Sequence, residues 1–170
     1  MTDARLVPLA PPAPPRRARA LPWLSVVAGS LVTAAPVVAT VPLLPPFGFL
    51  MLLAWRLLLR YSFKPWAAAP LGFVDDLVSG QPLGSAVLLW TVAVLLIELM
   101  EQRLVFRDWW QDWLVATALI AFALVGGRLL AVPLTAHVDS AVLIQGVIAA
   151  LLFPFATRLV ALLDARRGRA

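Results

Sequence analysis

The hydrophobic positions of the chain fall into six runs, of which the second and third are short for a membrane span of about 20 residues. Short stretches that carry charged residues, proline or glycine separate them. Runs of this length and hydrophobicity predict helices that lie in a membrane. Lys64-Pro65-Trp66 separates the second run from the third, and a turn at Gly80–Gly84 separates the third from the fourth. The sequence therefore predicts an all-α integral membrane protein, a bundle of six transmembrane helices. The six runs are residues 22–44, 47–63, 66–79, 83–100, 113–132 and 141–163.

Lysine and arginine mark one side of this predicted bundle. If the N-terminal arginines lie in the cytoplasm, six spans place the remaining basic clusters in the inner loops and the C-terminal tail. The outer loops, near residues 45, 81 and 133–140, then contain no lysine or arginine. This positive-inside pattern predicts that both termini are cytoplasmic. Five tryptophans also fall at the predicted cytoplasmic interface, whereas Trp55 and Trp90 are expected to pack in the interior. The five are Trp23, Trp66, Trp109, Trp110 and Trp113.

The pattern divides the chain into three parts. Residues 1–20 form a tail rich in proline and arginine, which we expect to be disordered and cytoplasmic. Residues 21–164 form the six-helix transmembrane domain, and residues 165–170 form a basic cytoplasmic tail.

Composition agrees with a chain that lies almost entirely in the membrane. Of its residues, 62% are hydrophobic and 14% are charged, whereas a soluble domain has about 45–50% apolar and about 25% charged residues. The chain contains no cysteine, which excludes disulfides, thiol catalysis and thiolate metal sites. A net charge of +5 could indicate nucleic-acid binding, but the basic residues lie at the ends of apolar runs and form no single stripe. Membrane topology explains them instead.

Two adjacent carboxylates, Asp75 and Asp76, lie in the third apolar run, where an ionised side chain costs about 3 kcal/mol even on the lower scales. At about 1.5 Å of rise per residue, Asp76 lies about 18 Å from Lys64 and Arg56 about 12 Å from it. We therefore expect an ion pair between Arg56 and one aspartate inside the bundle. The alternative is that Arg56 extends its guanidinium to the cytoplasmic headgroups.

On a helix, Asp76 shares one face with Gly72 and Gly80. Small residues allow another helix or a backbone segment to approach closely, so we expect Asp76 to make a packed polar contact. Asp75 points about 100° away from it. We expect Asp75 to face a different neighbour or a water-filled crevice.

An enzymatic interpretation of the two aspartates finds little support in the sequence. Paired aspartates can hold Mg²⁺ on pyrophosphate substrates, but such sites need a further acidic residue at a set spacing, and residues 77–80 supply none. The single histidine, His137, lies in an outer loop without an evident catalytic constellation. We therefore predict no enzyme activity and no catalytic, cofactor-binding or metal-binding residue.

The run Gly72-Phe-Val-Asp-Asp76-Leu-Val-Ser-Gly80-Gln-Pro-Leu-Gly84 resembles the central signature of the rod shape-determining protein MreD family, Gly-x-x-x-Asp-Leu-x-x-Gly-x-x-Leu-Gly. The resemblance is specific over residues 45–130. Asp75 stands where that signature has an aliphatic residue, and Arg56 has no counterpart that can be carried over. The residues that match the signature or its turn are Gly72, Asp76, Gly80, Pro82, Leu83 and Gly84.

The resemblance implies a non-enzymatic, multi-pass component of the bacterial inner membrane. It implies membership of the rod complex (the elongasome), beside MreC, the polymerase RodA, its transpeptidase partner and, indirectly, MreB. There it would scaffold side-wall peptidoglycan synthesis and maintain cell shape. An alternative function is that of a small-molecule-binding membrane subunit of a transporter, similar to the vitamin-transporter S components. Its pocket would be lined by Arg56, Asp75 and Asp76.

Overall fold

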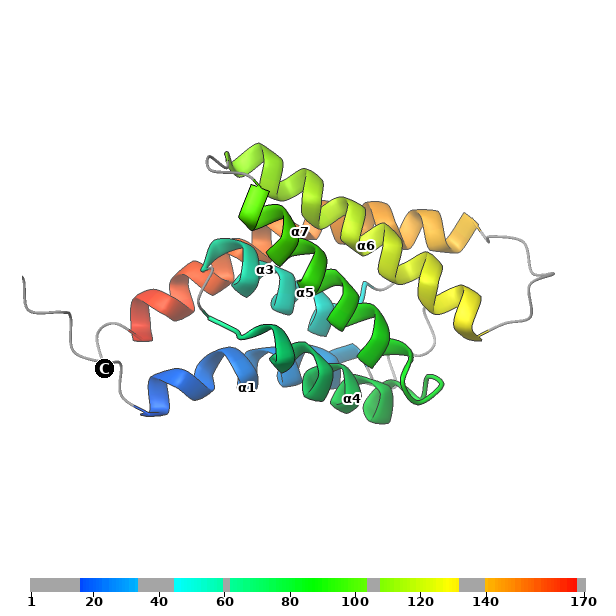
Figure 1. The fold of residues 1–170 in the computed structure, drawn as a ribbon, viewed down its shortest axis with the longest axis horizontal. Coiled ribbons are helices and arrows are strands. Elements are labelled where there is room, and N and C mark those ends of the chain that lie inside the picture. Colours follow the sequence, from blue (N-terminus) through cyan, green and yellow to red (C-terminus); the bar gives the residue numbers. More distant parts are fainter. Residues whose placement is uncertain (1–15, 34–44, 60–61, 104–107, 132–139, 168–170) are drawn as a thin grey trace, which may run out of the picture.

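The computed structural model describes residues 16–33, 45–59, 62–103, 108–131 and 140–167. Within these ranges the chain forms six α-helices and one short 3-10 helix, and no strand (Figure 1). The elements are α1 (Arg16–Thr33), α3 (Phe47–Leu58), η1 (Pro65–Ala67), α4 (Ala68–Ser79), α5 (Ser85–Arg103), α6 (Trp109–Ala131) and α7 (Ser140–Arg167).

The helices follow the predicted apolar runs, with three differences. Helix α1 begins at Arg16, so residues 16–20, which the sequence assigns to the tail, are helical. Helix α3 ends at Leu58, five residues before the end of its apolar run. Helix α7 extends through the start of the basic tail to Arg167. Residues 1–15 and 34–44, the rest of the predicted tail and of the first run, lie outside the described residues.

Three of the described helices are long and apolar enough to cross a membrane. Their candidate spans are Ser85–Gln102, Trp109–Leu130 and Val142–Arg166. Shorter apolar helices lie at Ala20–Thr33 and Phe47–Leu58. Length and hydropathy therefore indicate a membrane protein, while the count of six spans and the cytoplasmic placement of the termini stay predictions.

Helix α3 lies at the centre of the bundle, in contact with α1, α5, α6 and α7. Every residue from Gly48 to Leu57 is buried. Trp55 is among them, and its indole Nε1 donates a hydrogen bond of 2.7 Å to Ser25 Oγ on α1. Trp90 is also buried, with its ring 5.6 Å from that of Phe49. Both tryptophans are interior packing residues, as the sequence predicts.

The first helix and the start of η1 meet at one end of the bundle. The ring of Trp23 lies 5.7 Å from that of Phe63 and 5.9 Å from that of Trp66. Trp23 and Trp66 therefore lie at the same end of the molecule, and the placement of that end at the cytoplasmic interface stays a prediction.

Candidate functional site

A tight turn joins α4 to α5 and carries most of the signature residues. Gly80 ends α4 in the left-handed region, with φ of 67°, and Gly84 has φ of 97°. Both angles favour glycine, because a Cβ atom would be strained there. Between them, the carbonyl of Pro82 accepts a 3.0 Å hydrogen bond from Ser85 N, and Leu83 is 71% exposed. The turn thus reverses the chain within five residues.

The Asp76 carboxylate lies directly beneath this turn and is 1% exposed. Its Oδ2 accepts hydrogen bonds from Gly84 N (2.8 Å) and Val87 N (3.4 Å). Its Oδ1 accepts hydrogen bonds from Ala86 N (2.8 Å) and Ser85 Oγ (2.9 Å). A side chain of α4 therefore caps the N-terminus of α5.

This arrangement explains how a carboxylate can be buried without a basic partner. The first amides of a helix have no partner within the helix, and Gly84, which precedes α5, has no side chain to cap them. Asp76 supplies the missing acceptor from the neighbouring helix. Its negative charge also lies at the positive end of the helix dipole, where an anion is stabilised.

Gly72 allows the two helices to come together at this level. A Cβ atom on Gly72 would lie 2.8 Å from the backbone of Ala86, which cannot move aside as a flexible side chain could. The predicted packed polar contact of Asp76 is therefore confirmed, and the structure identifies its partner as the backbone of α5.

Asp75 faces away from the capped helix, as predicted, toward α1 and α3. Its Oδ1 lies 3.2 Å from where a Cβ on Gly48 would be, and the buried Ser30 Oγ approaches the same point. Asp75 also lines a cavity of about 640 Å³. The two adjacent aspartates thus have different surroundings: Asp76 is enclosed by backbone, and Asp75 borders open space.

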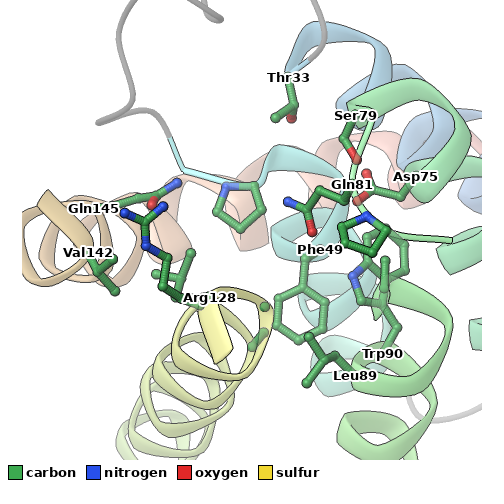
Figure 2. Close-up of a pocket in the computed structure, with 17 residues that line it drawn as sticks. Thr33, Phe49, Asp75, Ser79, Gln81, Leu89, Trp90, Arg128, Val142 and Gln145 are labelled. Atoms are coloured by element: carbon green, nitrogen blue, oxygen red, sulfur yellow. The ribbon is translucent and has the colours of Figure 1, made fainter. Parts of the chain in front are cut away.

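The cavity lies at the end of the bundle that holds the α4–α5 turn, and all six helices contribute to its lining. Figure 2 shows Arg128 and Gln145 on one side and Asp75 and Ser79 on the other, with Gln81 between them. Apolar side chains complete the wall, and the labelled ones are Phe49, Leu89, Trp90 and Val142. A space of this size, with a few polar groups on an apolar wall, is typical of a small-ligand site.

The predicted ion pair between Arg56 and an aspartate is wrong. Arg56 Nη2 lies 2.9 Å from Glu101 Oε2, near the C-terminal end of α5. The side chains of the two residues are 5% and 13% exposed, so Arg56 does not extend to the headgroups either. Gly48, which is level with Asp75, lies eight residues before Arg56 on α3, a separation of about 12 Å along the helix.

The pairing of Arg56 with Glu101 was not predicted. Glu101 lies among other charged residues at the end of an apolar run, a pattern typical of solvated side chains. One signal was available: a buried arginine needs a carboxylate, and the second and fourth apolar runs end on the same side of the predicted bundle, so the end of the fourth run can supply one at the same depth.

The three charged residues of the transporter alternative do not converge on one pocket. Of Arg56, Asp75 and Asp76, only Asp75 lines the cavity. Within the described residues, no group of three or more histidine, cysteine, aspartate or glutamate side chains is placed to hold a metal ion.

Comparison with known proteins extends the similarity well beyond the signature run. The family model of the rod shape-determining protein MreD matches residues 17–163 of the 170-residue chain. The chain belongs to the MreD family. Neither among curated proteins nor among solved structures is a match found. As an MreD-family member the chain is a rod shape-determining membrane protein, and the family signature can now be understood from the structure. Its aspartate caps α5, Gly72 lets α4 approach α5, and Gly80 and Gly84 form the turn.

Proposed function

We propose that this MreD-family chain is a non-enzymatic scaffold of the rod complex in the bacterial inner membrane. It crosses the membrane six times, with both termini in the cytoplasm. It holds MreC, and through MreC and the RodA machinery it directs side-wall peptidoglycan synthesis. The family match over residues 17–163 carries this proposal.

The contacts that the buried charged side chains make support a structural role for the protein. Asp76 is saturated by the amides and hydroxyl group at the start of α5, and Arg56 is paired with Glu101. Both groups hold helices together, and neither is placed to react with a substrate. A stable arrangement of helices is what a scaffold requires.

Partner contacts require surfaces that the chain does not use internally. The faces of three helix glycines are already occupied, because Gly72 and Gly126 contact α5 and Gly29 contacts the start of α3. Large apolar side chains remain exposed on α4 and α5, including Phe73, Leu77 and Leu88. We therefore place the partner surface on these side chains.

Depletion of the protein in its native host tests the proposal most directly. Cells should become round and wide, and rich medium supplemented with vitamins should not restore their shape. Normal shape, with a growth defect that a nutrient cures, would overturn the scaffold function and favour the transporter alternative.

A complementation experiment then tests the scaffold itself. Asp76→Asn should lower the amount of MreC recovered with the chain, because the α4–α5 pair that presents Phe73 and Leu77 loses its cap. The matched control is Asp108→Asn, at an exposed aspartate immediately before α6, where asparagine caps a helix equally well. Unchanged MreC recovery with Asp76→Asn would contradict the proposal.

A further inference from the structure

A second hollow lies beside the polar cavity, between α6 and α7. It has a volume of about 410 Å³, and its lining is almost wholly apolar, with Thr117 as the exception among larger side chains. Val125, Leu143, Val147 and Leu151 line it and are exposed. We call it the α6–α7 groove. In a membrane protein such a groove faces hydrocarbon.

The polar cavity and the α6–α7 groove adjoin each other. Leu124 and Val142 line both of them. From Val142 the groove follows α7 to Leu151, a distance of about 14 Å at 1.5 Å per residue. The hydrocarbon of one leaflet is about 15 Å thick, half of a core of about 30 Å. The groove therefore has about the length of one leaflet.

The charged side chains of the cavity complement a zwitterionic headgroup, which carries one positive and one negative charge. Arg128 is exposed on α6 and can donate paired hydrogen bonds to a phosphate group. Asp75 lies on the opposite side and can accept hydrogen bonds from an ammonium group (Figure 2). Gln81 and Gln145 add amide donors and acceptors between them.

We propose that the cavity and the α6–α7 groove together form a binding site for one zwitterionic glycerophospholipid. The phosphate binds Arg128, the primary ammonium group binds Asp75, and one acyl chain occupies the groove. On the predicted topology, the headgroup lies at the outer face of the membrane. The proposal does not depend on the partner surface, because the lining side chains are those of the chain itself.

Two other occupants share part of this chemistry. A soluble phosphate ester with an amine would fill only the cavity. A transmembrane helix of a partner would fill only the groove and would not need Arg128. The adjoining polar and apolar spaces favour a molecule with a charged head and a hydrocarbon tail, which is a lipid.

Native mass spectrometry of the purified, delipidated full chain tests the proposal. Added phosphatidylethanolamine should bind more tightly than phosphatidylglycerol, which has the phosphate but no ammonium group. Arg128→Gln should weaken binding of both lipids about tenfold or more, through loss of a charge-assisted contact. Asp75→Asn should abolish the preference between the two lipids. Arg158→Gln, at an exposed arginine of α7 outside the cavity, is the matched control and should bind as the wild type does.

The groove is tested by filling it. Gly146→Leu should reduce lipid binding, since Gly146 lines the groove and a Cβ there meets only Leu124 at 3.7 Å. Ala121→Leu, at a second lining residue that is exposed, serves if the first variant does not fold. Equal binding of the two lipids by the wild type, or full binding by Arg128→Gln, would overturn the proposal. Binding of glycerophosphoethanolamine as tight as that of the intact lipid would show a soluble ligand instead and would also overturn it.

Discussion

The two ends of the bundle bury charge in different ways. At the α4–α5 turn, the Asp76 carboxylate is surrounded by backbone amides and has no basic partner among its hydrogen bonds. At the opposite end of α5, Arg56 is buried against Glu101, a conventional ion pair. The first arrangement uses a helix terminus as the counter-charge, and the second uses a side chain. A helix end therefore serves as a charged partner that cannot be recognised from charged residues alone.

The amide-bound carboxylate should be the more sensitive of the two. Asp76→Asn introduces an NH₂ group that faces the N–H donors of α5, and each buried donor left unsatisfied costs about 1–3 kcal/mol. We expect the free energy of unfolding to fall by about 4 kcal/mol, measured by reversible denaturation in mixed micelles. The adjacent Asp75→Asn is the control, with an expected loss below about 1 kcal/mol, because Asp75 borders the cavity. Equal losses for the two variants would show that the cap is not the reason for the burial of Asp76.

The ion pair should be sensitive to loss of one partner but not to loss of both. Glu101→Gln leaves the Arg56 guanidinium buried without its carboxylate, which should cost about 3 kcal/mol in the same assay. The double variant Arg56→Met, Glu101→Leu should recover most of that loss, because apolar residues of similar volume replace buried pairs at little cost. A double variant as unstable as the single one would mean that the pair does more than neutralise charge.

The close approach of α4 and α5 should show a smaller effect. Gly72→Ala places a Cβ 2.8 Å from the backbone of Ala86, and such overpacking costs about 1–3 kcal/mol. Gly146→Ala is the matched control, because its nearest neighbour is 3.7 Å away. Alanine there should be neutral or stabilise the helix by about 0.5–1 kcal/mol. If the two alanine variants were equally stable, close contact with Ala86 would not explain why residue 72 is a glycine.

The elements themselves could be predicted from the sequence, because proline, glycine and charged residues separate the apolar runs. The different directions of Asp75 and Asp76 also followed from helix periodicity. The partner of Asp76 did not follow from helix periodicity. A search for charged partners ignores the backbone amides of a helix that starts after a glycine. That partner could have been inferred from Gly84, which cannot cap α5 itself.

The error over Arg56 has a simple geometric origin. The depth predicted for Arg56, measured from Lys64, assumes that residues 56–64 are all helical. Helix α3 ends at Leu58, so Arg56 lies in the last turn of its helix, and Glu101 lies two residues before the end of α5. The two side chains are therefore at the same level. The cavity and the adjoining α6–α7 groove depend on how all six helices pack together, which the pattern of a single apolar run does not predict.

The cap that links α4 to α5 has a consequence for biogenesis. Helix α4 has 12 residues, a length of about 18 Å, which is short for a bilayer core of about 30 Å, and it carries two aspartates. In hydrocarbon, its carboxylate needs the amides of α5, and those amides need an acceptor. We therefore expect α4 to remain at the translocon, while the chain is still attached to the ribosome, until α5 has emerged. The two helices would then enter the lipid together as a hairpin, with the carboxylate already bound at its tip.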